Sequence, residues 1–450
     1  MMGRTGAKTL FSDFSESNAV STRHAKPNQF AFGYISSKTM KTFSTRQFCL
    51  MSATLFATTV LTPAHAEETG PQSPFAEAVS ATKPIFNFRT RLETVEQDGF
   101  DEDATALTYR VRAGFETGAL FDTKLLVEFD HVDDLVDDFN STTNGKTNYP
   151  VVVDPQVTEL NRFQLTNTSL PDTTVTLGRQ RIIMDDSRFV GNVGWRQNEQ
   201  TFDGIRVTNE SLGKLKIDVA YVNQANRIFG DDSPAGRWTG DSYLANVSYP
   251  TPFGKLTGFA YMIDVEEVTA VSSQTLGARF AGKRELGPGT LDYTVSAAQQ
   301  SDYGSSNIDY DASYYLLDAG YAINKFSFKA GYEVLGGDDA RGFQTPFATL
   351  HKFQGWTDKF LGTPATGIED LYISAGYAPG DLGPLSKVKF GVVYHDFSSE
   401  TDSIDYGSEI GLVANAKWNV LSFTLKYADY SADAFSTDTQ KLWLQFDYSF

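Results

Sequence analysis

Apolar and polar residues alternate one by one through most of the chain after residue 80. In the segment 107–116, for example, Leu107, Tyr109 and Val111 alternate with Thr108 and Arg110. Successive side chains of a β-strand point to opposite faces, so each such segment has one apolar wall and one mainly polar wall. A soluble β-sandwich would show the same alternation, and only the connections between strands separate the two architectures.

The pattern predicts 18 strands, which begin near residues 84, 103, 121, 157, 173, 201, 214, 240, 255, 274, 289, 311, 326, 369, 387, 407, 421 and 439. Tight turns, such as 116–120, 170–172, 210–213 and 323–325, alternate with longer acidic loops, such as 133–156, 183–200, 226–239 and 336–368. Short turns on one rim, long loops on the other and an even strand count predict an all-β fold. We expect a transmembrane antiparallel β-barrel of about 18 strands with short periplasmic turns and long extracellular loops.

A segment before the alternating region has the features of a secretory signal. Lys41 and Arg46 precede a mostly apolar run at 48–61, and Ala64 and Ala66 supply small residues for a signal peptidase. A short buried helix is the alternative interpretation. We assign residues 1–39 to an upstream extension without a structural role, 40–66 to a signal peptide and 67–450 to the barrel. The outer membrane of a Gram-negative bacterium is the expected location.

The last predicted strand ends in an aromatic residue. Apolar and aromatic side chains alternate with polar ones from Leu442 to Phe450. A terminal strand of this kind resembles the signal that the barrel assembly machinery reads. We therefore expect that machinery to be a partner, through Phe450.

Composition excludes several other classes of protein. The chain is 41% hydrophobic, too apolar to be disordered, and its net charge of −18 argues against a nucleic-acid binder. Its only cysteine, Cys49, lies in the predicted signal, so disulfides and thiolate chemistry are not expected in the mature chain. His131, His351 and His395 are isolated in the sequence, and no G-x-S-x-G motif is present. We expect no catalysis, no cofactor and no metal centre.

The acidic residues concentrate in the predicted outer loops. Nine such loops hold 29 Asp and Glu against 8 Lys and Arg. Loop hydration explains most of this charge. The alternative is that dense clusters, such as those at 98–103 and 133–138, bridge divalent cations to lipopolysaccharide. Outer-membrane lipid and lipopolysaccharide are the expected surroundings.

The inward face of the predicted barrel is rich in cations. Alternation points the following residues inward: Arg89, Arg91, Arg110, Arg112, Arg162, Arg206, Arg279, Lys214 and Lys389. Acidic residues of the same parity could pair with them and cross-link a polar lumen. Alternatively, surplus arginines form a ladder for anionic solutes, because the guanidinium group matches carboxylate geometry.

Two stretches resemble a known family. The segment LGRQRIIMDDSRFVGNVGWRQNEQTFDGIRV (177–207) contains GRQ, D-x-R-F, WRQ and TFDG words in order, and FQTPFATLHKFQGWTDKFLGTPATGIEDLYI (343–373) follows. Both are similar to segments of the alginate-export family of outer-membrane proteins. The resemblance implies an 18-stranded barrel with an arginine-lined pore partly closed by folded-in loops.

The resemblance adds residues to the expected pore lining, namely Arg179, Arg181, Arg188, Arg196, Asp203 and Arg206. Strand parity places Arg206 inward but puts Arg179 and Arg181 on the lipid side with Leu177. A bulge near Gly178, or a position above the membrane, would reconcile the two indications.

Within the second stretch, apolar residues recur near helical spacing. Leu350, Phe353, Trp356 and Phe360 predict an amphipathic helix that packs the loop onto the rim or into the lumen. A gate that moves with solute is the sharper hypothesis.

These observations together favour an outer-membrane porin that conducts passively. The expected solutes are anions, such as uronates or acidic oligo- or polysaccharides. A secretion conduit for alginate or another exopolysaccharide is a second possibility. A structural or adhesion barrel with a plugged lumen is a third.

Overall fold

The computed structural model describes residues 73–450, so the predicted signal peptide and upstream extension lie outside the described residues. A short helix, α1 (Pro74–Ser80), precedes the strands. Within residues 73–450, no helix has both the length and the apolar character needed to cross a membrane.

Eighteen strands follow, and every predicted start lies within three residues of the observed one. They are β1 (Lys83–Gln97), β2 (Ala104–Glu116), β3 (Thr123–Asp138), β4 (Val157–Asn167), β5 (Thr173–Gln180), β6 (Thr201–Asn209), β7 (Lys216–Asn226), β8 (Arg237–Thr251), β9 (Gly254–Ile263), β10 (Ser273–Leu286), β11 (Gly289–Asp302), β12 (Asp311–Ile323), β13 (Phe326–Leu335), β14 (Ile368–Leu382), β15 (Leu385–Ser398), β16 (Asp405–Trp418), β17 (Leu421–Ala432) and β18 (Thr439–Ser449).

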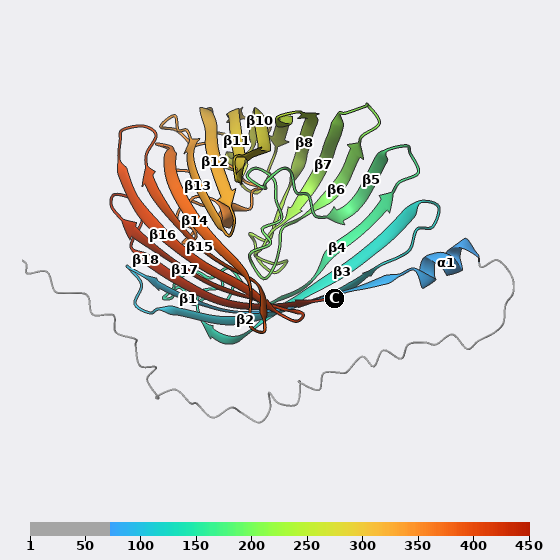
Figure 1. The fold of residues 1–450 in the computed structure, drawn as a ribbon, viewed down its shortest axis with the longest axis horizontal. Helices are drawn as coiled ribbons and strands as arrows, with labels where there is room; N and C mark the ends of the chain where they lie inside the picture. Colours follow the sequence, from blue (N-terminus) through green and yellow to red (C-terminus); the bar gives the residue numbers. More distant parts are fainter. Residues whose placement is uncertain (1–72) are drawn as a thin grey trace, which may run out of the picture. The chain divides into compact units, whose positions relative to one another are not determined.

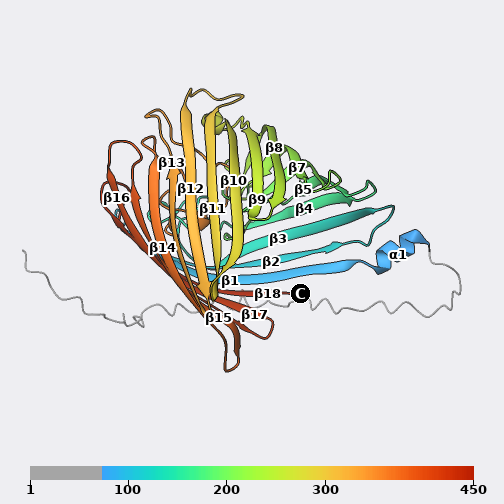
Figure 2. The same ribbon diagram turned by 45° about the horizontal axis from the view of Figure 1, so that its top comes forward.

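The sheet closes on itself. Each strand pairs antiparallel with its neighbours in sequence, and β1 pairs with both β2 and β18. The first and last strands therefore lie side by side, as Figures 1 and 2 show. Closure leaves no unpaired strand edge, which is the condition for a sheet to exist in lipid. The predicted 18-stranded antiparallel barrel is confirmed.

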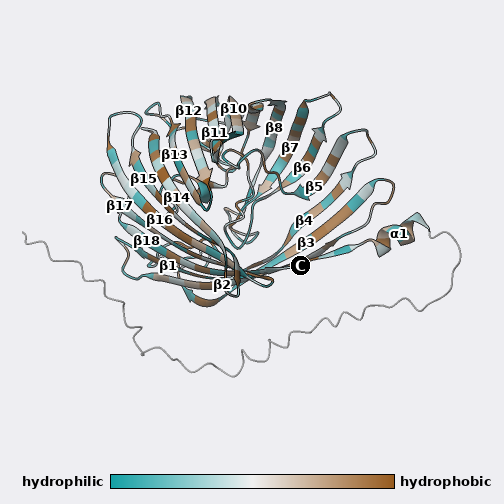
Figure 3. Cartoon of the chain, in the orientation of Figure 1, coloured by the Kyte–Doolittle hydropathy of each residue, from teal (hydrophilic) through white to brown (hydrophobic). Residues whose placement is uncertain are grey.

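The two faces of the wall differ as the alternation predicts. On β12, Leu317 is 61% exposed, whereas its neighbours Leu316 and Asp318 are buried. Apolar and polar segments alternate along the strands in Figure 3. Large apolar side chains such as Phe328 and Ile373 are likewise exposed. They form the lipid-facing surface of an outer-membrane barrel.

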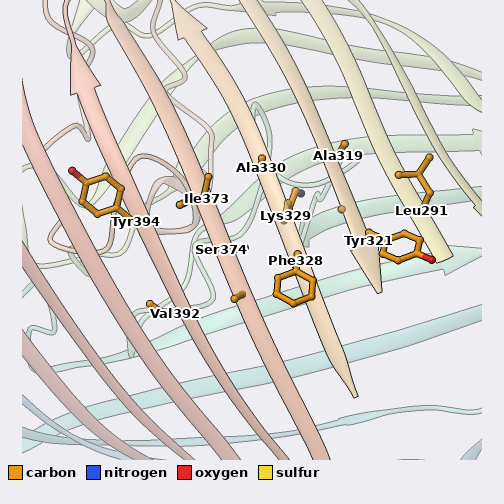
Figure 4. A pocket seen from close by; sticks show the side chains of 12 residues that line it. Leu291, Ala319, Tyr321, Phe328, Lys329, Ala330, Ile373, Ser374, Val392 and Tyr394 are labelled. Atoms are coloured by element: carbon orange, nitrogen blue, oxygen red, sulfur yellow. The ribbon is translucent and has the colours of Figure 1, made fainter. Parts of the chain in front are cut away.

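A groove of about 530 Å³ crosses this outer surface over β11–β15 (Figure 4). The small side chains of Ala319 and Ala330 form part of its lining, between larger residues such as Tyr321, Phe328 and Ile373. These residues share the parity of Leu317 along the strands, so the groove opens toward lipid and is no part of a pore.

The interior is partly filled by two long connections. The β5–β6 loop (residues 181–200) and the β13–β14 loop (residues 336–367) contribute Val190, Phe343 and Phe347 to a buried apolar cluster. Strand residues such as Phe202 and Tyr314 complete it. Both loops therefore fold into the barrel, as predicted, and pack against the strands that contribute to this cluster.

The helix predicted around 350–360 is wrong. Only a single 3₁₀ turn, η2 (Leu350–Lys352), forms there. Gln354, Gly355 and Asp358 have positive φ angles of 49°, 82° and 64°, and the left-handed conformation cannot continue a right-handed helix. The apolar spacing arises instead because successive aromatic residues fill separate interior sites.

Replacing Leu317 by Arg tests the outward face. At mid-membrane positions an outward arginine costs about 2–4 kcal/mol. We expect Leu317→Arg to lower the free energy of unfolding by that amount more than Leu317→Ala, measured by urea titration in lipid vesicles. Equal effects of the two substitutions would contradict a lipid-facing Leu317.

Candidate functional site

The β5–β6 and β13–β14 loops hold each other inside the barrel. The Gly191 amide donates to the Phe347 carbonyl at 2.8 Å, and the Thr349 amide donates to the Ser187 carbonyl at 3.0 Å. The Val193 amide donates to the Thr349 hydroxyl at 3.1 Å. We call the pair of loops the partition.

Arginines of β1 and β2 hold one end of the partition. The Arg89 guanidinium donates to the carbonyl oxygens of Gly194, Trp195 and Arg196 at 3.1–3.2 Å. Arg91 also donates to the Trp195 carbonyl, and Arg110 donates to the Gln197 carbonyl at 3.0 Å. These three predicted pore arginines therefore bind backbone of the chain itself.

The other end of the β5–β6 loop is held across the lumen. Arg188, fully buried, donates to Glu333 of β13 at 2.7 Å and to Gln354 at 3.1 Å. Asp186 pairs with Arg279 of β10 at 2.8 Å. The loop thus spans the interior from β1 and β2 to β10 and β13.

Glu199 joins several of the predicted cations. Its carboxylate lies 3.1 Å from Arg112, binds Arg181 and accepts from Asn161 at 2.7 Å. Burial disfavours its charged form, but Arg112 and Arg181 outweigh that effect and lower the pKa of Glu199 to about 2. Arg181, just beyond the end of β5, therefore faces the lumen.

A lysine surrounded by aromatic rings anchors the β13–β14 loop. The Lys426 ammonium of β17 lies 3.9 Å from the Trp356 ring centroid, 4.4 Å from that of Trp195 and 5.3 Å from that of Trp443. It also lies 2.7 Å from His351 Nε2, while His351 Nδ1 lies 2.7 Å from Asp358. Burial and the neighbouring lysine lower the pKa of His351 to about 3, so the neutral ring accepts from Lys426 at pH 7.

Most of the remaining predicted arginines are also paired. Arg162 binds Glu128 at 2.7 Å, and Arg206 binds Asp218 at 2.6 Å. Arg196 reaches Glu93 at 3.0 Å. The interpretation in which charge pairs cross-link a polar lumen thus describes these contacts.

The two predicted lysines differ from the arginines. Lys389 is exposed, and no carboxylate of the described residues lies within 4 Å of it. The structure corrects the prediction that Lys214 lines the pore. Strand β7 begins at Lys216, two residues later than predicted, so Lys214 lies exposed in the turn before the strand.

Arg179 and Asp203, which were also predicted to line the pore, instead lie on the outward face of the barrel. The β5–β6 register is continuous and places them opposite each other, on the same face as Leu177 and Ile205, which are exposed to lipid. Their ion pair, at 2.8 Å, lies in a groove of the outer surface. Gly178 has a φ of 107° but introduces no shift of register, so strand parity holds.

Two cavities lie against the partition. One, of about 430 Å³, is lined only by long-loop and strand-end residues, including Arg196, Arg227, Trp238 and Leu350; we call it the vestibule. The other, of about 510 Å³, is lined by strands β10–β16 and by partition residues; we call it the chamber. Residues 350–351 and 358 face the vestibule, whereas 352–354 and 356 face the chamber, so the β13–β14 loop separates the two cavities.

The vestibule and chamber both present cations. Arg227 was not predicted as a site residue. Its guanidinium stacks 3.6 Å from the Trp238 ring centroid, and its Nη1 donates to the Ala235 carbonyl, with no carboxylate of residues 73–450 within 4 Å. The aromatic residues near Arg227 in loop 226–239, Phe229 and Trp238, are the sequence feature that could have identified it as a site residue. In the chamber, Arg279, Lys329 and Lys352 face Asp186 and Asp318.

Across the described strands and loops, no group of three or more His, Cys, Asp and Glu side chains is arranged to hold a metal ion.

A closed 18-stranded barrel with an apolar outer surface, short turns on one rim and inward-folded loops is an outer-membrane porin fold. Solved structures with this fold include Pseudomonas aeruginosa OpdO, with a TM-score of 0.65 and 15% identity over 84% of this chain and 99% of that one. P. aeruginosa OccK1 (OpdK) gives a TM-score of 0.63 and 13% identity over 83% and 99%. OpdK crystallised with vanillate gives 0.62 and 14% over the same shares.

No protein-family model and no curated protein sequence matches the chain. The similarity to these solved structures, at 13–15% identity, establishes the fold.

The depressed pKa of Glu199 predicts how the partition responds to acid. Ionised Glu199 stabilises the docked loop above its ordinary pKa of 4.5, and this contribution, on the order of 3 kcal/mol, is lost as the pH falls through about 2. We expect pepsin cleavage within 181–200 to rise between pH 4.5 and 2, and Glu199→Gln to remove part of that rise. Identical pH profiles for the two proteins would contradict this role.

Replacing Lys426 by Met tests the aromatic cage. Each cation–π contact contributes about 0.5–2 kcal/mol when desolvated, and Met has no charge to offer the three indole rings. We expect trypsin to cleave at Lys352 or Lys359 about tenfold faster in Lys426→Met. Lys389→Met is the control, because Lys389 is an exposed lysine outside the cage; an equal rate in both variants would contradict the anchoring role.

Proposed function

We propose that this protein is a passive outer-membrane channel for small organic anions. The observation that carries the proposal is the succession of two cavities on either side of the partition, each with accessible cationic groups. A solute carboxylate can engage Arg227 in the vestibule and then Lys352 in the chamber, because Arg279 and Lys329 are already paired with Asp186 and Asp318.

Cavity size favours small solutes over polymers. Volumes of about 430 and 510 Å³ lie in the range of small-molecule binding sites. A uronate fits this description, in keeping with the alginate-export resemblance. Vanillate, present in one OpdK structure, is also a small carboxylate. A polysaccharide would require the partition to leave the lumen, so the secretion conduit is the less favoured candidate.

The charged groups that remain accessible in the lumen determine whether the channel selects anions or cations. Most inward arginines are neutralised by partners, and the outer loops are acidic, so selectivity depends on the few cations that remain accessible. Burial lowers the pKa of Arg227 to about 10, which keeps it charged at pH 7. A low-dielectric wall strengthens its attraction for a carboxylate.

Single-channel recording of residues 67–450 in a planar bilayer tests the proposal. We expect a reversal potential that favours anions under a salt gradient, and block of the current by uronate or an aromatic carboxylate. Arg227→Ala should weaken that block by about 10- to 100-fold, as expected for one charge-assisted hydrogen bond.

Arg237→Ala provides the matched control, because Arg237 is an exposed arginine at the start of β8. A preference for cations would show that the acidic rim governs permeation. The absence of openings would support the structural barrel with a plugged lumen.

A further inference from the structure

The apolar belt of the outer wall is narrow at β5 and β6. On β12 the successive apolar outward positions are Tyr315, Leu317, Ala319, Tyr321 and Ile323. On β5 they are only Val175 and Leu177, and the next outward residue is Arg179. On β6 they are Val207 and Ile205, and the next is Asp203. The two shortest strands of the barrel thus carry a narrower apolar belt than β12.

The number of apolar outward positions on a strand gives the height of the apolar belt along the membrane normal. Strands rise about 3.3 Å per residue and tilt about 40°, so the five positions on β12 span roughly 20 Å of the membrane normal. The two on β5 span roughly 5 Å between their Cα atoms by the same rule. Even with Leu170 of the adjoining turn, which is exposed, this wall does not fill an apolar band of about 25 Å.

A polar cluster lies directly above the narrow belt. Arg179 and Asp203 form two hydrogen bonds, at 2.8 and 3.0 Å, and Arg179 also donates to the Leu160 carbonyl. Asn223, left unpaired by a bulge of β7, is exposed beside them. A bilayer would have to thin around these groups, which costs energy for each ångström of mismatch.

The same residues line a groove of about 530 Å³ on the outer surface. Leu177 and Phe163, which is 49% exposed, stand beside Ile205 and Tyr221 around it. The surface therefore combines a protruding aromatic ring, a depression and a charge pair within three adjacent strands.

We propose that the outward wall of β4, β5 and β6 is an interface with a second copy of this chain. The Arg179–Asp203 pair has no net charge, so it offers little attraction to a lipid phosphate. Because it places opposite charges side by side, it is complementary to the same pair on a copy related by a two-fold axis. A protein surface also satisfies Asn223 and covers the wall where lipid would be too thick.

Cysteine cross-linking in outer membranes tests the interface. The only native cysteine, Cys49, lies in the predicted signal, so a single Leu177→Cys substitution labels β5 specifically. We expect a short bis-maleimide to give a band at twice the monomer mass, at least about fivefold more abundant than for Leu317→Cys. Leu317 is the matched control because it is a similarly exposed leucine, 61% against 53%, on distant β12.

Two outcomes would overturn the proposal. One is equal cross-linking of the two variants, and the other is a Leu177→Cys product at a mass other than twice the monomer. If Leu177→Cys fails to fold, Ile205→Cys takes its place. Independently, brominated lipid should quench Leu177→Trp less than Leu317→Trp, and equal quenching would show that lipid covers β5.

Discussion

Lipid offers no hydrogen-bond partner to a backbone amide or carbonyl, and this constraint shapes the whole molecule. It requires β1 to pair with β18, because any other arrangement of the sheet leaves two open edges. It also fixes the alternation of side chains, since one face of every strand must meet hydrocarbon while the other encloses water or loops. The strand lengths, the inward cations and the exposed leucines all follow from that closed ring.

Inside the barrel, ion pairs and hydrogen bonds determine which cationic side chains remain available to bind a solute. Arginines on β1 and β2 donate to backbone carbonyls of the β5–β6 loop and hold it in place, whereas Arg162 on β4 is neutralised by Glu128 of β3. Cations outside this network, such as Arg227 and Lys389, keep their attraction for a solute. The number of inward arginines is therefore a poor measure of selectivity, because a paired guanidinium contributes structure instead of a binding site.

Strand positions could be read from the sequence because a period of two is imposed locally on every strand by lipid and lumen. The partition could not, because it depends on contacts such as Arg188 with Glu333 and Lys426 with Trp356, between residues far apart in the chain. Strand parity put Arg179 on the outward face correctly, whereas the motif resemblance had added it to the pore. The helix expected near Trp356 failed because loop residues with positive φ interrupt it.

The pairing of Val190 with Phe347 joins two loops that are separated in the sequence by strands β6 to β13. Long-range contacts of this kind form slowly, because the chain between them must first be ordered. The lumen is divided only when both loops are in place, which requires β13 and the loop that follows it. A truncated or stalled barrel would be an undivided hole in the membrane, so the permeability barrier of the finished protein is itself a product of complete assembly.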